Sequence, residues 1–235
     1  MTTADTNTAY SHALIGWLRM QWAGVWLIPL LLSLVHGTAQ STPPIAATNA
    51  TTPHDFLVVQ VRVHLLTEDS GSPLNSSMTA ARVEQTWPAI NRIWAAAAIR
   101  FQLETVLTEA ARPGPIPDHP HKASPEWLRV YLPIDQRGTN VLNVYFVEQC
   151  SVNGICFPDA IVVKPRPELR PVPGGTDNPL ARVIAHELGH ALGLAHRLDY
   201  DNLMSPGTTG IKLNAAEISQ ARAQVPVLFR QVRSK

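Results

Sequence analysis

The sequence predicts an α+β domain, in which helices pack on a β-sheet. Three observations predict this class: β-rich alternation over residues 56–66, an apolar stripe at helical spacing over residues 77–98, and a second such stripe over residues 179–192. The chain has 235 residues, a length that suits one domain with an appendage. No internal repeat is visible.

The elements follow in order from the apolar patterns. Phe56 to Leu66 alternates as a strand does, and residues 77–98 form a long helix that Pro88 should kink. Asn178 and Pro179 suit the cap and the first turn of a later helix. The remaining elements are a strand over residues 99–107, a proline-rich loop over 108–126, strands over 141–147 and 160–164, and helices over 179–192 and 214–224.

The N-terminal region is typical of an export signal rather than of a folded element. Residues 22–35 form an uncharged, mostly apolar run behind Arg19, and residues 37–39 are small, as suits a signal-peptide cleavage site. The run is shorter than the roughly 20 apolar residues of a membrane span. An uncleaved anchor stays open as the alternative, because residues 13–18 are also apolar.

This signal sets the expected boundaries and location. We expect a signal peptide or membrane anchor over residues 1–39, a flexible linker over 40–54, and a single folded domain over 55–235. The protein would then be secreted, periplasmic or extracellular, and it would touch a membrane only if the anchor is uncleaved. We expect a monomer. The net charge of +1, without a basic block, gives no support for nucleic-acid binding.

The two cysteines, Cys150 and Cys156, are candidates for a disulfide. An exported chain allows them to pair, and the loop between them contains the turn-forming pair Asn153-Gly154. Closing so short a loop would contribute roughly 2 kcal/mol in the chain-entropy model. Two free thiols are the alternative. A zinc role is not indicated, because no second cysteine pair is present.

The strongest motif of the chain is the string from His186 to His196, H-E-L-G-H-A-L-G-L-A-H. On a helix, His186 and His190 lie one turn apart and point the same way, with Glu187 beside them. Gly193 lets the backbone leave the helix, so that His196 can return as a third ligand. Three protein ligands leave one tetrahedral position of a zinc ion open, which is typical of a catalytic site. The alternative is an amphipathic helix with surface histidines.

This string resembles the extended zinc motif of the metzincin metallopeptidases. Residues 202–206, Asn-Leu-Met-Ser-Pro, are similar to the methionine turn of that family, and their spacing and proline are most similar to the matrixin branch. Met204 would then pack beneath the metal. Arg197 departs from the serine that is usual in matrixins, and no tyrosine ligand follows Met204. The resemblance implies a twisted, mainly parallel sheet with an antiparallel edge strand, a long helix and an active-site helix.

The resemblance also implies an activity. It indicates a secreted endopeptidase in which His186, His190 and His196 hold one catalytic Zn²⁺ and Glu187 activates the zinc-bound water as general base. Peptides or proteins would be its substrates. A zinc-stabilised peptide-binding module without turnover and an exopeptidase are the alternatives. A structural Ca²⁺ is possible in the family, but no calcium-loop signature supports it.

The resemblance further suggests where a substrate binds. The strand candidates Ala160, Ile161, Val162 and Val163 come just before the zinc helix. If this is an edge strand, an extended peptide can add to it through backbone hydrogen bonds, as in the family. An interior strand is the alternative. The family layout places specificity in residues 205–213 and near the rim formed by residues 150–156.

Overall fold

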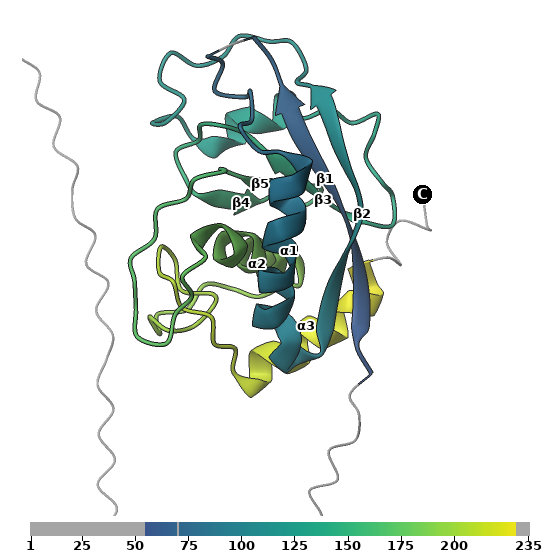
Figure 1. Cartoon of the computed structure of the whole chain (residues 1–235), viewed down its shortest axis with the longest axis vertical. Coiled ribbons are helices and arrows are strands. Elements are labelled where there is room, and N and C mark those ends of the chain that lie inside the picture. The colour runs from purple at the N-terminus through teal and green to yellow at the C-terminus, as the bar shows by residue number, and fades with distance from the viewer. Residues whose placement is uncertain (1–54, 70, 229–235) are drawn as a thin grey trace, which may run out of the picture. The chain divides into compact units, whose positions relative to one another are not determined.

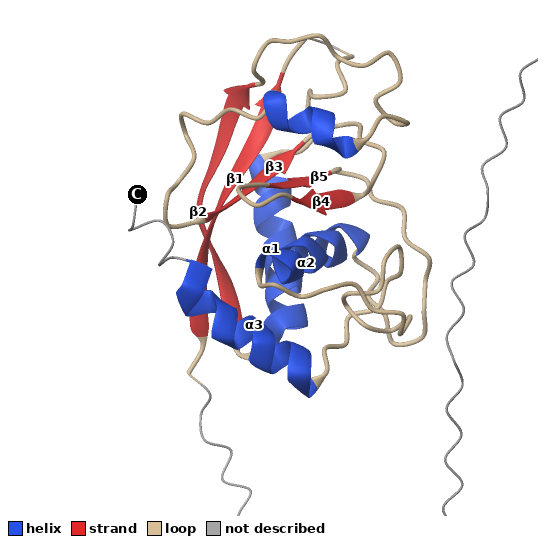
Figure 2. Cartoon of the chain, turned by 180° about the vertical axis from the view of Figure 1, so that it is seen from behind, coloured by secondary structure: helices blue, strands red, loops and turns tan. Residues whose placement is uncertain are grey.

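A mostly parallel sheet is the main layer of the computed structural model, which describes residues 55–69 and 71–228. Its five strands have the order β2-β1-β3-β5-β4, and only β4 is antiparallel to its neighbour. Helices α1 and α2 lie against the same face of the sheet, and α3 follows as the last element (Figures 1 and 2). The bounds are β1 Leu57–Thr67, α1 Ala80–Trp94, β2 Ile99–Ala110, β3 Leu142–Phe146, β4 Gly154–Cys156, β5 Ile161–Val163, α2 Pro179–Ala191 and α3 Ala215–Leu228. This confirms the predicted α+β class with a mainly parallel sheet and an antiparallel edge strand.

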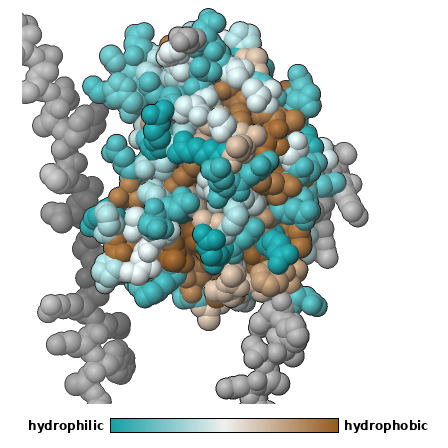
Figure 3. All heavy atoms as spheres, viewed as in Figure 1, coloured by the Kyte–Doolittle hydropathy of each residue, from teal (hydrophilic) through white to brown (hydrophobic). Residues whose placement is uncertain are grey.

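The predicted signal or anchor segment and the linker lie outside the described residues. Among the residues that are described, no helix has the length and apolar character needed to span a bilayer. Hydrophobic and hydrophilic side chains are intermixed over the face that Figure 3 shows, as they are on ordinary folded domains.

The core between the sheet and the helices follows from strand alternation. Val59, Val61 and Val63 of β1 are fully buried and face the helices. They lie in one hydrophobic cluster with Trp94 of α1 and Leu188 of α2, which are also fully buried. Burying such side chains contributes roughly 1.5–3 kcal/mol each. Helix α2 is therefore fixed to the sheet and to α1 by its apolar side.

Helix α1 is shorter than the predicted 77–98. It begins at Ala80 because the Thr79 hydroxyl caps it, accepting a hydrogen bond from the Arg82 N–H at 3.2 Å. After Trp94 one 3-10 turn follows, and Ala98 takes a positive φ of 48° that directs the chain into β2.

A second apolar cluster covers the opposite face of the sheet. Leu66, Tyr145 and Val162 project from the strands into it, and Leu128 and Leu132 cover them from the segment between β2 and β3. This segment contains the 3-10 helix Pro125–Val130, which begins at the end of the predicted proline-rich loop and was not predicted.

The strand at the edge of the sheet is β4, which corrects the expectation for Ala160, Ile161, Val162 and Val163. Strand β5 is interior, because it pairs with β3 on one side and with β4 on the other. All four residues are buried. The edge strand Gly154–Cys156 was not predicted, since three residues that include a glycine carry no strand pattern.

The two cysteines are not bonded to each other, which corrects the expected disulfide. Cys150 is buried in the cluster on the outer face of the sheet, whereas Cys156 packs against the core on the helix side. Cys156 is also held in the β4 ladder opposite Ile161. Because the sheet separates the two side chains, the short spacing in sequence does not bring the sulfur atoms together.

Candidate metal centre

Helix α2 begins and ends as its sequence predicts. The Asn178 side chain accepts a hydrogen bond from the Ala181 N–H at 3.0 Å, and Pro179 is the first helical residue. At the other end Gly193 adopts a positive φ of 79°, which glycine adopts at little cost. The chain then turns back, with the Leu194 N–H bonded to the Gly189 carbonyl at 2.9 Å. This exit brings His196 over the two histidines of the helix.

The three predicted histidines meet at one point. Their Nε2 atoms are 3.1 Å apart for His186–His190, 3.1 Å for His190–His196 and 3.3 Å for His186–His196. Tetrahedral zinc with N–Zn bonds of about 2.0–2.1 Å requires nitrogen–nitrogen distances of about 3.3 Å. The geometry therefore fits one zinc ion. In the described part of the chain, these three histidines are the one cluster of side chains that could hold a metal ion.

Hydrogen bonds on the far side of two rings decide which nitrogen faces the metal position. His186 Nδ1 donates to the Leu203 carbonyl at 2.7 Å, and His190 Nδ1 donates to the Leu194 carbonyl at 2.8 Å. The Nε2 lone pairs then point toward each other, an arrangement that a cation stabilises. Burial lowers the pKa of His186 to about 3 and also lowers that of His190, so both rings are neutral ligands at neutral pH.

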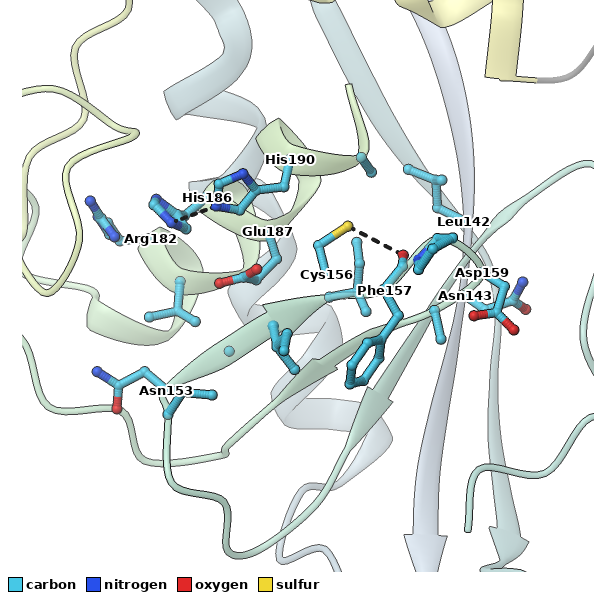
Figure 4. Close-up of a pocket in the computed structure, with 18 of the residues that line it drawn as sticks. Leu142, Asn143, Asn153, Cys156, Phe157, Asp159, Arg182, His186, Glu187 and His190 are labelled. Atoms are coloured by element: carbon cyan, nitrogen blue, oxygen red, sulfur yellow. Dashed lines mark hydrogen bonds between the residues drawn. The ribbon is translucent and has the colours of Figure 1, made fainter. Parts of the chain in front are cut away.

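Glu187 lies between α2 and the edge strand β4 (Figure 4). Its side chain is only 5% exposed, and this burial raises its pKa to about 8, although the charge of Arg182 acts in the opposite direction. A Cβ placed on Gly154 would be 2.8 Å from both Cγ and Oε1 of Glu187. Gly154 therefore leaves the space that this carboxylate occupies.

Met204, the methionine of the predicted turn, packs against helix α2 in the core. It is fully buried, and its backbone N–H donates to the Asn202 side chain at 2.6 Å. A Cβ on Gly189 would be 2.6 Å from its sulfur. Sequence reasoning overlooked Gly189, although a glycine inside a helix costs about 1 kcal/mol and so signals a close approach.

Arg182 is a second residue of the site that sequence reasoning missed. Its side chain is 1% exposed and donates to three backbone carbonyls, those of Leu203 at 2.8 Å, Gly210 at 3.2 Å and Ser205. Burial lowers its pKa to about 10, which still leaves it charged at neutral pH. Arg182 thus fixes the methionine turn and the following loop to α2.

A cleft of about 1420 Å³ opens at the metal centre. It is lined by the histidines and Glu187 on α2, by β4, and by Pro206 and Gly207 after the methionine turn. Figure 4 shows Asn153 on one side of Glu187 and Asp159 on the other. The lining residues therefore extend in both directions from the centre.

The fold and the histidine cluster are those of the zincin class of zinc metallopeptidases. The sequence model of the matrixin family, Peptidase_M10, matches residues 92–225, which is more than half of the chain. The chain belongs to the matrixin family.

The chain is also similar to solved structures, of which mirolysin, with a TM-score above 0.5, supports the fold. Mirolysin, solved in complex with compound 9, is 12% identical and covers 77% of this chain and 97% of its own, with a TM-score of 0.53. Archaemetzincin from Methanopyrus kandleri is 18% identical and covers 78% of this chain and 99% of its own, with a TM-score of 0.38. Metalloproteinase-II from Bacteroides fragilis is 14% identical and covers 71% of this chain and 52% of its own, with a TM-score of 0.41. No match is found among curated proteins.

Proposed function

We propose that this chain is a zinc-dependent endopeptidase in which His186, His190 and His196 hold the metal and Glu187 is the general base. The convergence of the three Nε2 atoms within 3.3 Å, beside a buried carboxylate, carries the proposal. Zinc in such a site supplies a Lewis acid that lowers the pKa of water and polarises a carbonyl.

Glu187 performs the proton transfers in this proposal. In its carboxylate form, which predominates above its pKa of about 8 and which the charge of bound zinc would favour further, it accepts a proton from the attacking water and later delivers it to the leaving amine. Its contact with β4 at Gly154 supports this role, because a peptide bound along the edge strand would pass close to the carboxylate. Arg182 supports a ligand indirectly, because it donates to the same Leu203 carbonyl as His186, and Met204 packs against Gly189 of α2.

The edge strand β4 is the proposed docking site for the substrate backbone. Its outer edge has no partner strand in the described sheet, so an extended peptide can add to it by backbone hydrogen bonds. Lining residues on both sides of Glu187 suit a peptide that continues past the scissile bond in both directions. This favours an endopeptidase over an exopeptidase.

Metal removal tests this function. We expect the zinc-loaded protein to cleave a quenched-fluorescence peptide library with blocked termini, to lose this activity in 1,10-phenanthroline, and to regain it when Zn²⁺ is restored. Mass spectrometry of the products should show internal cleavage. Full activity in the chelator would exclude the zinc mechanism. Stoichiometric zinc binding with peptide binding but no cleavage would favour the peptide-binding module.

Gly154→Ala tests the contact between β4 and the general base. The added Cβ would overlap Glu187 and Val183, which lie within 2.9 Å of its position. Displacing a catalytic group by about 1 Å costs up to about 100-fold in rate, so we expect kcat to fall roughly 10- to 100-fold. Zinc stoichiometry should stay at the wild-type value. An unchanged kcat would show that Glu187 is not held by this strand.

Export is a separate part of the proposal. The apolar run over residues 22–35 and the small residues that follow support secretion with cleavage near Ala39. N-terminal sequencing of protein recovered from outside the expressing cell would test it. A mature chain that retains residues 1–39 would indicate a membrane anchor instead.

A further inference from the structure

His196 is held differently from the other two ligands. The Nδ1 atoms of His186 and His190 donate to backbone carbonyls, whereas no partner for His196 Nδ1 is found among the described residues. The residue is also exposed and follows the helix exit, rather than lying on α2. Its position must therefore be set by the chain that continues from it.

That chain is tied to α3 by an ion pair. Arg197 directly follows His196, and its Nε donates to Glu217 Oε1 at 2.8 Å. The backbone N–H of Arg197 also donates to the Met204 carbonyl at 3.0 Å. Arg197 thus connects the third ligand to both the methionine turn and the last helix.

Glu217 is the common acceptor of this network. Although it is only 3% exposed, its carboxylate also accepts hydrogen bonds from Asn202 Nδ2 at 2.9 Å and from the Asn214 N–H at 2.8 Å. Asn202 in turn holds the backbone N–H of Met204. A buried carboxylate is costly unless such donors satisfy it. One side chain on α3 therefore joins the loop of the third ligand to the methionine turn.

We propose that the Arg197–Glu217 ion pair is a positioning device for His196, through which α3 sets the geometry and zinc affinity of the metal centre. The inference rests on the proposed zinc site. Arg197 occupies the position where matrixins usually carry serine, so this chain would position its third ligand by an ion pair of its own.

Zinc affinity is the first readout. Arg197→Ala and Glu217→Gln should each weaken zinc binding about 10-fold in competition with a chromophoric chelator, since partners behind a ligand contribute 10- to 100-fold. Arg197→Lys should retain most of the affinity. Because both single variants break the same pair, the double variant should lose little more than either one. The matched control is Lys212→Ala, which removes an exposed ion pair with Asp201 that does not touch Arg197; its zinc affinity should be unchanged.

Spectroscopy separates positioning from general stability. With Co²⁺ in place of zinc, the visible absorption bands of Arg197→Ala and Glu217→Gln should shift relative to wild type. The metal-free Arg197→Ala protein should lose little thermal stability, because the Glu217 carboxylate keeps its hydrogen bonds from Asn202 and Asn214. Unchanged zinc affinity and cobalt spectra in both variants would overturn the inference while leaving the proposed function intact. A wild-type protein that binds no zinc would overturn both.

Discussion

Glu187→Gln is expected to abolish most peptide cleavage while leaving the metal centre loaded. Glutamine has nearly the same shape but cannot accept the proton of the attacking water, and loss of general-base catalysis costs roughly 100- to 10,000-fold. Glu187 is not one of the three clustered nitrogen ligands, so zinc stoichiometry should stay at one per chain. Single-turnover cleavage of a blocked peptide and metal analysis of the same sample would measure both quantities.

The stability of this variant gives an internal check. Burial raises the pKa of Glu187 to about 8, which means that a carboxylate is costly at this position. The neutral amide should therefore not lower the thermal midpoint of the metal-free protein. Glu84→Gln, a change on the exposed side of α1, is the matched control and should keep full activity. If Glu187→Gln retains more than a tenth of the wild-type rate, another group is the base.

The metal ligands could be predicted because their geometry is local. Helical periodicity places His186 above His190, and a single glycine at position 193 is enough to bring His196 back within eleven residues of chain. Capping chemistry also fixed the limits of this helix: residues 179–192 were predicted, and Pro179–Ala191 is observed. Strong local signals and tertiary structure agree at this point of the fold.

Which strand forms the edge of the sheet could not be predicted from local sequence in the same way. Whether a strand is interior depends on its neighbours, and the strand that covers β5 has only three residues. A signal was nevertheless present: residues 160–163 are apolar without alternation, which is typical of a strand buried on both faces. The resemblance to the family drew attention to the right feature, an edge strand beside the zinc helix, but assigned it to the wrong segment.

The polar residues behind the ligands were missed for another reason. Arg182 and Glu217 stand on helices where a charged residue usually faces solvent. Their acceptors and donors lie up to 28 residues away along the chain. No periodicity within either helix reports such contacts, so only the packing of α2 and α3 against the methionine turn reveals them. The cysteines show the reverse case, in which proximity in sequence suggested a contact that the sheet prevents.

Arg182→Met should be the most destabilising of the proposed substitutions. Methionine can fill much of the volume but leaves the carbonyls of Ser205 and Gly210 without their Arg182 donor, and the Leu203 carbonyl with one donor fewer. A buried acceptor without a partner costs about 1–3 kcal/mol, so we expect the free energy of unfolding to fall by about 3 kcal/mol or more. Denaturant unfolding of the metal-free protein would measure this loss.

The matched control is Arg92→Met, which changes an exposed arginine on α1 and should leave the unfolding midpoint within experimental error. Equal midpoints for the two variants would show that the three carbonyls do not depend on Arg182.

The zinc-loaded protein adds a second test. The Leu203 carbonyl accepts from both Arg182 and His186, so loosening the methionine turn should also misplace this ligand. Because bound zinc stabilises only the folded state, weaker zinc binding must make the loss of stability larger in the loaded protein than in the metal-free one.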